Sequence, residues 1–164
     1  MRSRESTLAL KAELQGDIKQ LERVLIHNHK AWERIEAGAD DYVDWGALAL
    51  TLHTAYGVME SYFLRVSKYF ENNLPSDRWH KALLEKMTLE IAGLRPALIE
   101  SESMKAHTVE LLKFRHRIRN LYGEEIDPEK TKAIQETAME LFPSFVKAHT
   151  AFITKLDAIA GVLP

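Results

Sequence analysis

The sequence predicts an all-α protein, an up-and-down antiparallel bundle of four to five helices. Apolar residues recur at intervals of three and four along most of the chain, as they do on one face of an α-helix. No segment alternates apolar and polar residues as a half-buried strand does, and no segment repeats another. Only 7 of the 164 residues are Gly and 5 are Pro. We therefore expect one helical domain over residues 1–164 with short connections.

The first half of the chain predicts two long helices. Apolar residues at helical spacing place one stripe on a helix over about residues 6–37. Gly38, followed by two aspartates, supplies a helix end and turn residues. The same period resumes at Trp45 and continues to Phe70, which predicts a second, aromatic-rich helix.

A third helix is expected over about residues 77–92. Ser76 is a suitable N-cap for it, because Ser side chains accept hydrogen bonds from the first turn of a helix. Gly93 and Pro96 are typical of the residues that end helices.

Two further helices complete the expected bundle. A fourth helix over residues 104–121 presents an inward stripe and ends before Gly123. Asp127 and Pro128 are typical of a helix start. The last helical region continues to Ile159, with an interruption or kink at Pro143.

Composition excludes several classes of protein. Cys is absent, which excludes a disulfide scaffold, thiolate metal sites and a Cys nucleophile. No apolar run approaches the ~20 residues that span a bilayer, so we expect no membrane association and a cytoplasmic location. Lys and Arg total 22 against 24 acids, and the net charge of -2 argues against a uniformly basic nucleic-acid binder.

Familiar catalytic and metal motifs are missing as well. The chain has no Gly-rich phosphate loop, no His-Glu-x-x-His and no Gly-x-Ser-x-Gly. Its 7 histidines are dispersed, and the rings of His27 and His29 point to different sides of one helix. We therefore expect neither a metal nor another cofactor.

The exceptional segment lies near the end of the fourth expected helix. Residues 113–119 hold four cations and no acid. Arg115, Arg119 and Tyr122 fall on one stripe flanking the apolar face, and His116 and Asn120 form another that points away from the bundle. Such an arrangement suits an anion or phosphate site. Alternatively, these cations and the acids of residues 124–129 simply complement two helix dipoles.

These residues resemble the signature of the HEPN superfamily, and within it the HepT-like toxins that pair with minimal nucleotidyltransferase antitoxins. That signature is Arg, a polar neighbour, a spacer ending in His, one further residue and Tyr. Arg115, His116 and Tyr122 match it, and Asn120 stands at the His position. The resemblance extends over most of the chain, including residues 52–70, 73–84 and 122–130, and implies a HEPN-like helical fold.

The resemblance implies that a homodimer cleaves RNA at a shared cleft without a metal. Arg115 would hold the scissile phosphate, and Arg117 and Arg119 would add cations for the RNA backbone. Asn120 does not titrate near neutral pH, so proton transfer would fall to His116 or to another histidine such as His80 or His53. The partner nucleotidyltransferase would modify Tyr122 with AMP; alternatively, Tyr122 only caps the apolar stripe where the helix ends.

Two functions follow from these residues. The first is a HepT-like toxin, a metal-independent ribonuclease or a weakened descendant of one, controlled by a nucleotidyltransferase. The second is an inactive HEPN module that binds nucleotide, RNA or that transferase. Asn120 favours the second. We interpret Glu60 as either a surface acid or the partner of a motif arginine, with preference for the partner, and Trp79 and His80 chiefly as packing residues.

Overall fold

The computed structural model describes residues 2–71, 79–93, 95–121, 123 and 125–164. Over these ranges the chain forms five helices and no β-strand, apart from an isolated bridge between Ile91 and Arg95. The helices are α1 (Arg4–Glu36), α2 (Tyr42–Phe70), α3 (Trp79–Thr88), α4 (Glu102–Arg119) and α5 (Pro128–Val162). The predicted all-α bundle is confirmed.

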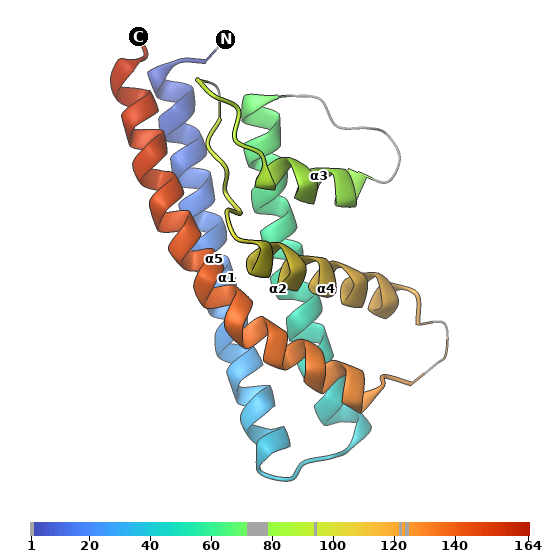
Figure 1. The fold of residues 1–164 in the computed structure, drawn as a ribbon. Helices are drawn as coiled ribbons and strands as arrows, with labels where there is room; N and C mark the ends of the chain where they lie inside the picture. The colour runs from blue at the N-terminus through green and yellow to red at the C-terminus, as the bar shows by residue number, and fades with distance from the viewer. Residues whose placement is uncertain (1, 72–78, 94, 122, 124) are drawn as a thin grey trace.

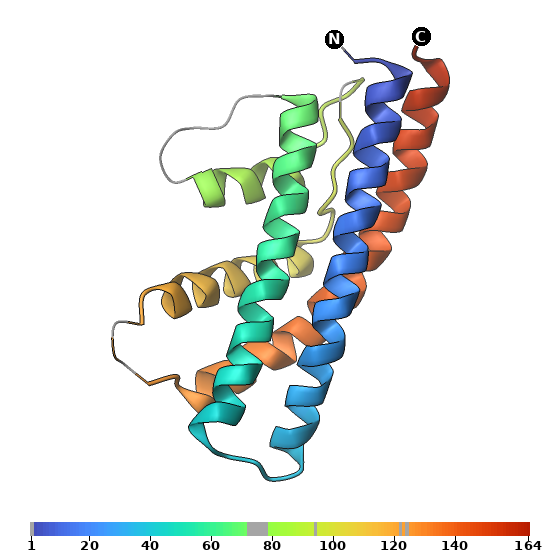
Figure 2. The ribbon, with the colours of Figure 1, turned by 180° about the vertical axis from the view of Figure 1, so that it is seen from behind.

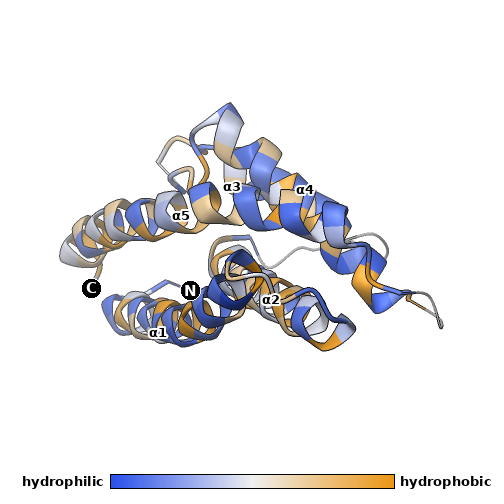
Figure 3. Ribbon diagram, turned by 90° about the horizontal axis from the view of Figure 1, so that it is seen from below, coloured by the Kyte–Doolittle hydropathy of each residue, from blue (hydrophilic) through white to orange (hydrophobic). Residues whose placement is uncertain are grey.

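The helices lie in two layers. Long α1 and α2 form an antiparallel pair, and α5 runs along α1, so both chain ends lie at the same end of the bundle (Figures 1 and 2). Viewed along the long helices, α1 and α2 make one layer, and α3, α4 and α5 make the other (Figure 3). The short helices α3 and α4 cross α2 instead of running along it. The free ends of α3 and α4 therefore project to one side of the bundle.

Aromatic side chains from α2 and α5 fill the contact between the two layers. Phe145 is completely buried, with its ring 5.1 Å from the Tyr62 ring and 5.9 Å from the Phe63 ring, both edge to face. Such geometry adds to the free energy gained from burying apolar area. Tyr62 also uses its hydroxyl, 2.9 Å from Nδ1 of the buried His149.

A buried amide pair fixes the register between α1 and α5. Asn28 donates to Oε1 of Gln135 at 2.8 Å, and Gln135 donates back to Oδ1 of Asn28 at 3.0 Å. Asn28 also donates to the Thr51 hydroxyl on α2 at 3.0 Å. Buried polar groups are costly unless paired, so sliding one helix along another would break these bonds.

The third helix is shorter than expected at its end. It stops at Thr88 and not near residue 92, because the backbone N–H groups of Leu98 and Ile99 both donate to the Met87 carbonyl at 3.0 Å. The returning chain thus takes the carbonyl that a further helical turn would have used. Gly93, with a φ of 71°, lies in the turn that brings the chain back. The expected N-cap Ser76 lies outside the described residues.

The last helix has one of the two forms expected for it, a continuous helix in place of an interrupted one. It runs unbroken from Pro128 through Pro143 to Val162 and bends along its length (Figure 1). Proline lacks an N–H and its ring crowds the preceding turn, so a bend without a break is the physical outcome at Pro143. The interruption that the sequence suggested is therefore absent within α5.

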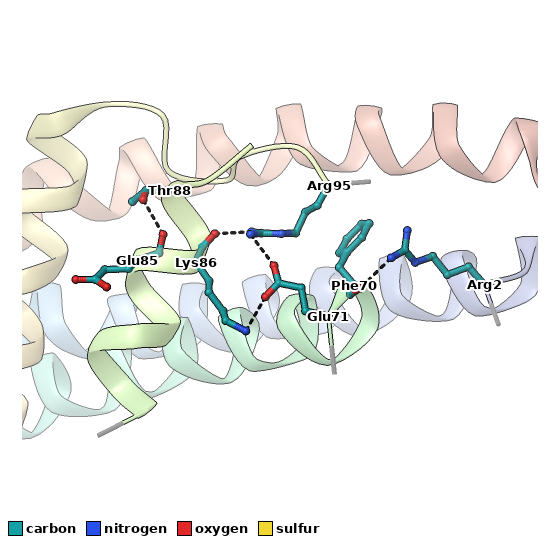
Figure 4. A network of polar contacts seen from close by, with 7 residues as sticks. All are labelled: Arg2, Phe70, Glu71, Glu85, Lys86, Thr88 and Arg95. Atoms are coloured by element: carbon teal, nitrogen blue, oxygen red, sulfur yellow. Dashed lines mark hydrogen bonds and ion pairs between the residues drawn. The ribbon is translucent and has the colours of Figure 1, made fainter. Parts of the chain in front are cut away.

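An ionic cluster at the end of α2 holds α3 in place. Glu71 accepts contacts from Lys86 of α3 and from Arg95 of the following segment, each at 2.7 Å (Figure 4). Arg95 is only 1% exposed and also donates to the Lys86 carbonyl. Arg2 donates to the Phe70 carbonyl at 2.8 Å beside them. These contacts join α2, α3 and the α3–α4 connection, and so fix where α3 presents His80.

Candidate functional site

The fourth helix carries the basic segment and is anchored by its other face. Ser101 accepts from the Met104 N–H at 3.0 Å as the N-cap. The residues that follow at helical spacing are buried: Met104, Thr108, Leu111 and Phe114. The helix ends at Arg119, so Asn120 is its C-cap and not part of its last turn, as the sequence had suggested. A clear apolar stripe therefore sets which residues of 113–119 face outward.

Arg115 does not point into solvent but packs against α2. Its Nη1 donates to Oε1 of Glu60 at 2.6 Å, and its side chain is 20% exposed while that of Glu60 is 6% exposed. The guanidinium lies 6.0 Å from the Tyr56 ring centroid. A Cβ on Gly57 would lie 3.8 Å from Cζ of Arg115, so the guanidinium rests closely over this glycine. The interpretation of Glu60 as the partner of a motif arginine is confirmed.

The Glu60 carboxylate also contacts a second side chain, His80 of α3. Nδ1 of His80 lies 2.6 Å from Oε2, the other oxygen of the same carboxylate. A buried carboxylate is tolerated only when such partners replace its water. Glu60 thus joins His80 of α3 to Arg115 of α4, and both line one small depression with Leu112, His116 and Arg119.

His116 and Asn120 are exposed at the end of α4, as their helical positions predicted. The Asn120 amide donates to the His116 carbonyl at 2.8 Å and lies 3.4 Å from Nε2 of the same residue. The amide therefore caps the helix end. This role requires a hydrogen-bond donor and no titrating group.

Two further cations extend the positive surface. Arg117 and Arg119 are exposed, with the Arg117 guanidinium 5.9 Å from the Phe114 ring. On α2, burial and the nearby charges of Arg115 and Arg119 lower the pKa of His53. Burial, together with the Glu60 carboxylate, raises the pKa of Tyr56, which stays a neutral phenol beneath Arg115. The site thus places the guanidinium groups of Arg115 and Arg119 near the His53 imidazole, whose lowered pKa favours its neutral form.

The ion pairs of the α4 arginines can be compared with the alternative in which these cations only complement helix dipoles. Within the described part of the chain, Arg115, Arg117 and Arg119 form no ion pair with the acids that begin α5; Arg115 pairs with Glu60 instead. Complementing a dipole needs charge near a helix end but no buried acid on another helix. Helix-dipole complementation therefore does not account for the pairing of Arg115 with Glu60. Tyr122, predicted to be the modified residue, lies outside the described residues.

The described residues contain neither a metal-binding cluster nor a membrane-spanning helix. No three His, Asp or Glu side chains among the described residues are grouped to hold a metal ion. None of the helices described is both long and apolar enough to traverse a bilayer.

The sequence indicated His80 chiefly as a packing residue, and the structure places its ring against Glu60. Local sequence patterns do not reveal that α3 brings this ring to α2. A weaker signal was present in α2, where His53, Gly57 and Glu60 are spaced by four and three and so share one face. That face is the one α4 packs against.

A helical bundle whose arginine-rich α4 ends in Arg-x4-Asn, with the first arginine anchored on the neighbouring long helix, has the features of a HEPN-type domain. The model of a family described as HepT-like protein matches residues 47–156, about two thirds of the chain. The chain therefore belongs to the HepT-like family of the HEPN superfamily. Comparison with curated proteins and with solved structures gave no match.

Proposed function

We propose that this protein is a HepT-like toxin that cleaves RNA without a metal at the Arg115 site. The observation that carries the proposal is the anchoring of Arg115. Glu60 holds Nη1, and Nη2 forms no hydrogen bond within the described residues. A fixed guanidinium with a donor to spare is suited to a phosphodiester, because its charge is permanent and its fork matches phosphate oxygens.

The neighbouring residues support binding of a polyanion. Arg119 lines the same depression as Arg115, and Arg117 is exposed about 200° around the helix from both of them. Each exposed arginine adds a phosphate contact that strengthens binding at low salt. Because the net charge of the chain is -2, RNA would be drawn to this local surface and not to the molecule as a whole.

The second candidate is a binding module that has lost cleavage. Asn120 favours it, since its amide caps α4 and supplies no proton acceptor. Under this alternative, Arg115 still binds RNA or nucleotide, and the protein acts by occupying its ligand. Separate measurements of RNA cleavage and RNA binding distinguish the two candidates.

Arg115→Ala is expected to lower the RNA cleavage rate by about 10²-fold or more, the effect typical of removing a donor that stabilises a transition state. Arg115→Lys should lose most of this activity too, because an ammonium lacks the planar fork. The assay uses a labelled RNA of mixed sequence with EDTA present. A 2′-O-methyl RNA of the same sequence, which lacks the attacking hydroxyl, reports binding.

Lys113→Ala is the matched control, because Lys113 is exposed on the same helix and pairs only loosely with Glu110, at 3.7 Å. It should cleave and bind as the unchanged protein does. Equal losses in the Lys113 and Arg115 variants would indicate a diffuse basic patch and contradict the proposed site. Binding without any cleavage by the unchanged protein would favour the binding module.

The proposal includes a homodimer, in which two copies of the site face each other. Exposed apolar side chains on α1 and α2 support it, Leu8, Ile26, Val43 and Leu50 among them. Light scattering at micromolar concentration should give about twice the chain mass of 18.8 kDa. A mass that stays at the single-chain value would remove the shared cleft.

The proposed partner is a small nucleotidyltransferase acting as antitoxin. Tyr122 is close to Arg115 and Arg119 in the sequence, so AMP added to it would bring a phosphate near these arginines. Charge-assisted hydrogen bonds from the arginines to this phosphate would compete with RNA binding. A gene for such a transferase next to the gene for this protein would support this pairing.

A further inference from the structure

We propose that His80, oriented by Glu60, is the general base of this site, a role that the Asn120 amide cannot take. The inference rests on the proposed RNA cleavage. Its starting point is the shared carboxylate. Oε1 of Glu60 holds Arg115 and Oε2 holds Nδ1 of His80, both at 2.6 Å. The guanidinium and the imidazole are therefore held at a fixed separation by one buried group.

The orientation of the ring suits proton transfer. With Nδ1 directed at Glu60, Nε2 lies on the opposite side of the ring. The His80 side chain is 34% exposed and lines the depression that also contains Arg115 and Arg119. A carboxylate that fixes an imidazole and stabilises the imidazolium formed on proton uptake is the arrangement by which a histidine serves as base.

The other histidines of the region lack this support. His116 is exposed, and the polar contact of its ring within the described residues is with the Asn120 amide, at 3.4 Å. His53 forms no hydrogen bond within the described residues, although it lies near Arg115 and Arg119. The charged and titratable groups that face His80 across the depression are Glu60 of α2 and Arg115, His116 and Arg119 of α4. Of the histidines at this site, His53, His80 and His116, only His80 contacts a carboxylate within the described residues.

The step conserves atoms and charge. Nε2 of His80 takes the proton of the ribose 2′-hydroxyl as O2′ bonds to phosphorus, and the bond from phosphorus to O5′ breaks. Water supplies the proton to the departing O5′, and the imidazolium returns its proton to solvent. The products are a 2′,3′-cyclic phosphate and a 5′-hydroxyl end. Arg115 offsets the negative charge that grows on the phosphate oxygens.

His80→Asn tests the assignment, because the Asn amide nitrogen replaces Nδ1 and keeps the bond to Glu60 but cannot accept a proton. We expect cleavage to fall by about 10² to 10⁴-fold, the range for losing a general base, with unchanged affinity for 2′-O-methyl RNA. His27→Asn is the matched control, because His27 is exposed on α1 and outside the depression, and it should retain the cleavage rate; His116→Asn is measured beside it. Products should end in cyclic phosphate.

A second variant keeps the test informative about chemistry. Added imidazole should raise the cleavage rate of His80→Gly by at least about tenfold. It should not raise the cleavage rate of Arg115→Ala. A purely structural role for His80 would show as parallel losses of cleavage and binding without rescue, and would overturn the inference.

The outcomes separate this inference from the proposed function. Full activity of His80→Asn beside an inactive Arg115→Ala would overturn the role of His80 and leave the ribonuclease intact. Activity lost only in His116→Asn would assign the base to His116. An unchanged protein that cleaves nothing would overturn both.

Discussion

Glu60→Ala is expected to destabilise the protein by about 3 kcal/mol, the lower end of the range for breaking a buried ion pair. The substitution leaves the Arg115 guanidinium, only 20% exposed, without the charge that compensates its burial. It also removes the partner of Nδ1 of His80, so α2 loses its polar contacts with both α3 and α4 at this point. Partial access of water to Arg115 keeps the loss at the lower end.

Urea denaturation at fixed protein concentration measures this effect, since a dimer would make stability depend on concentration. The matched control is the pair Glu60→Met with Arg115→Met, which removes both charges together. It should be more stable than Glu60→Ala, because no unpaired charge remains buried. A loss below about 1 kcal/mol for Glu60→Ala would show that the pair behaves as an exposed one.

Phe145→Ala is expected to cost about 3–5 kcal/mol, as for other buried Phe side chains. Phe145 is 0% exposed and packs on the rings of Tyr62 and Phe63 across the two layers. Alanine would leave a cavity that the rigid long helices α2 and α5 close only in part.

Met139→Ala on the same helix is the control, because Met139 is 54% exposed. Its effect should stay within about 0.5 kcal/mol, which is typical of surface substitutions. Similar losses for both variants would mean that the burial of Phe145 does not set the stability of α5. Thermal and urea unfolding together provide the measurement.

The sequence by itself determined the helices and their buried faces. Apolar spacing and capping residues located all five helices, with ends that differ by a few residues, because these signals act within one or two turns. Asp127 caps α5, as the sequence predicted. The same periodicity placed His116 and Asn120 on an outward face, and the motif around Arg115 indicated the HepT-like family.

Only the tertiary structure decided which helices meet and at what angle. Periodicity tells which side of a helix is apolar, but it carries no information about the partner helix, so the crossing of α3 and α4 over α2 was not predictable. Glu60, His80 and Arg115 are separated by 20 and 35 residues along the chain. They meet because Glu71, Lys86 and Arg95 tie α3 to the end of α2. The bonds that orient His80 thus arise from long-range packing, which local sequence patterns do not encode.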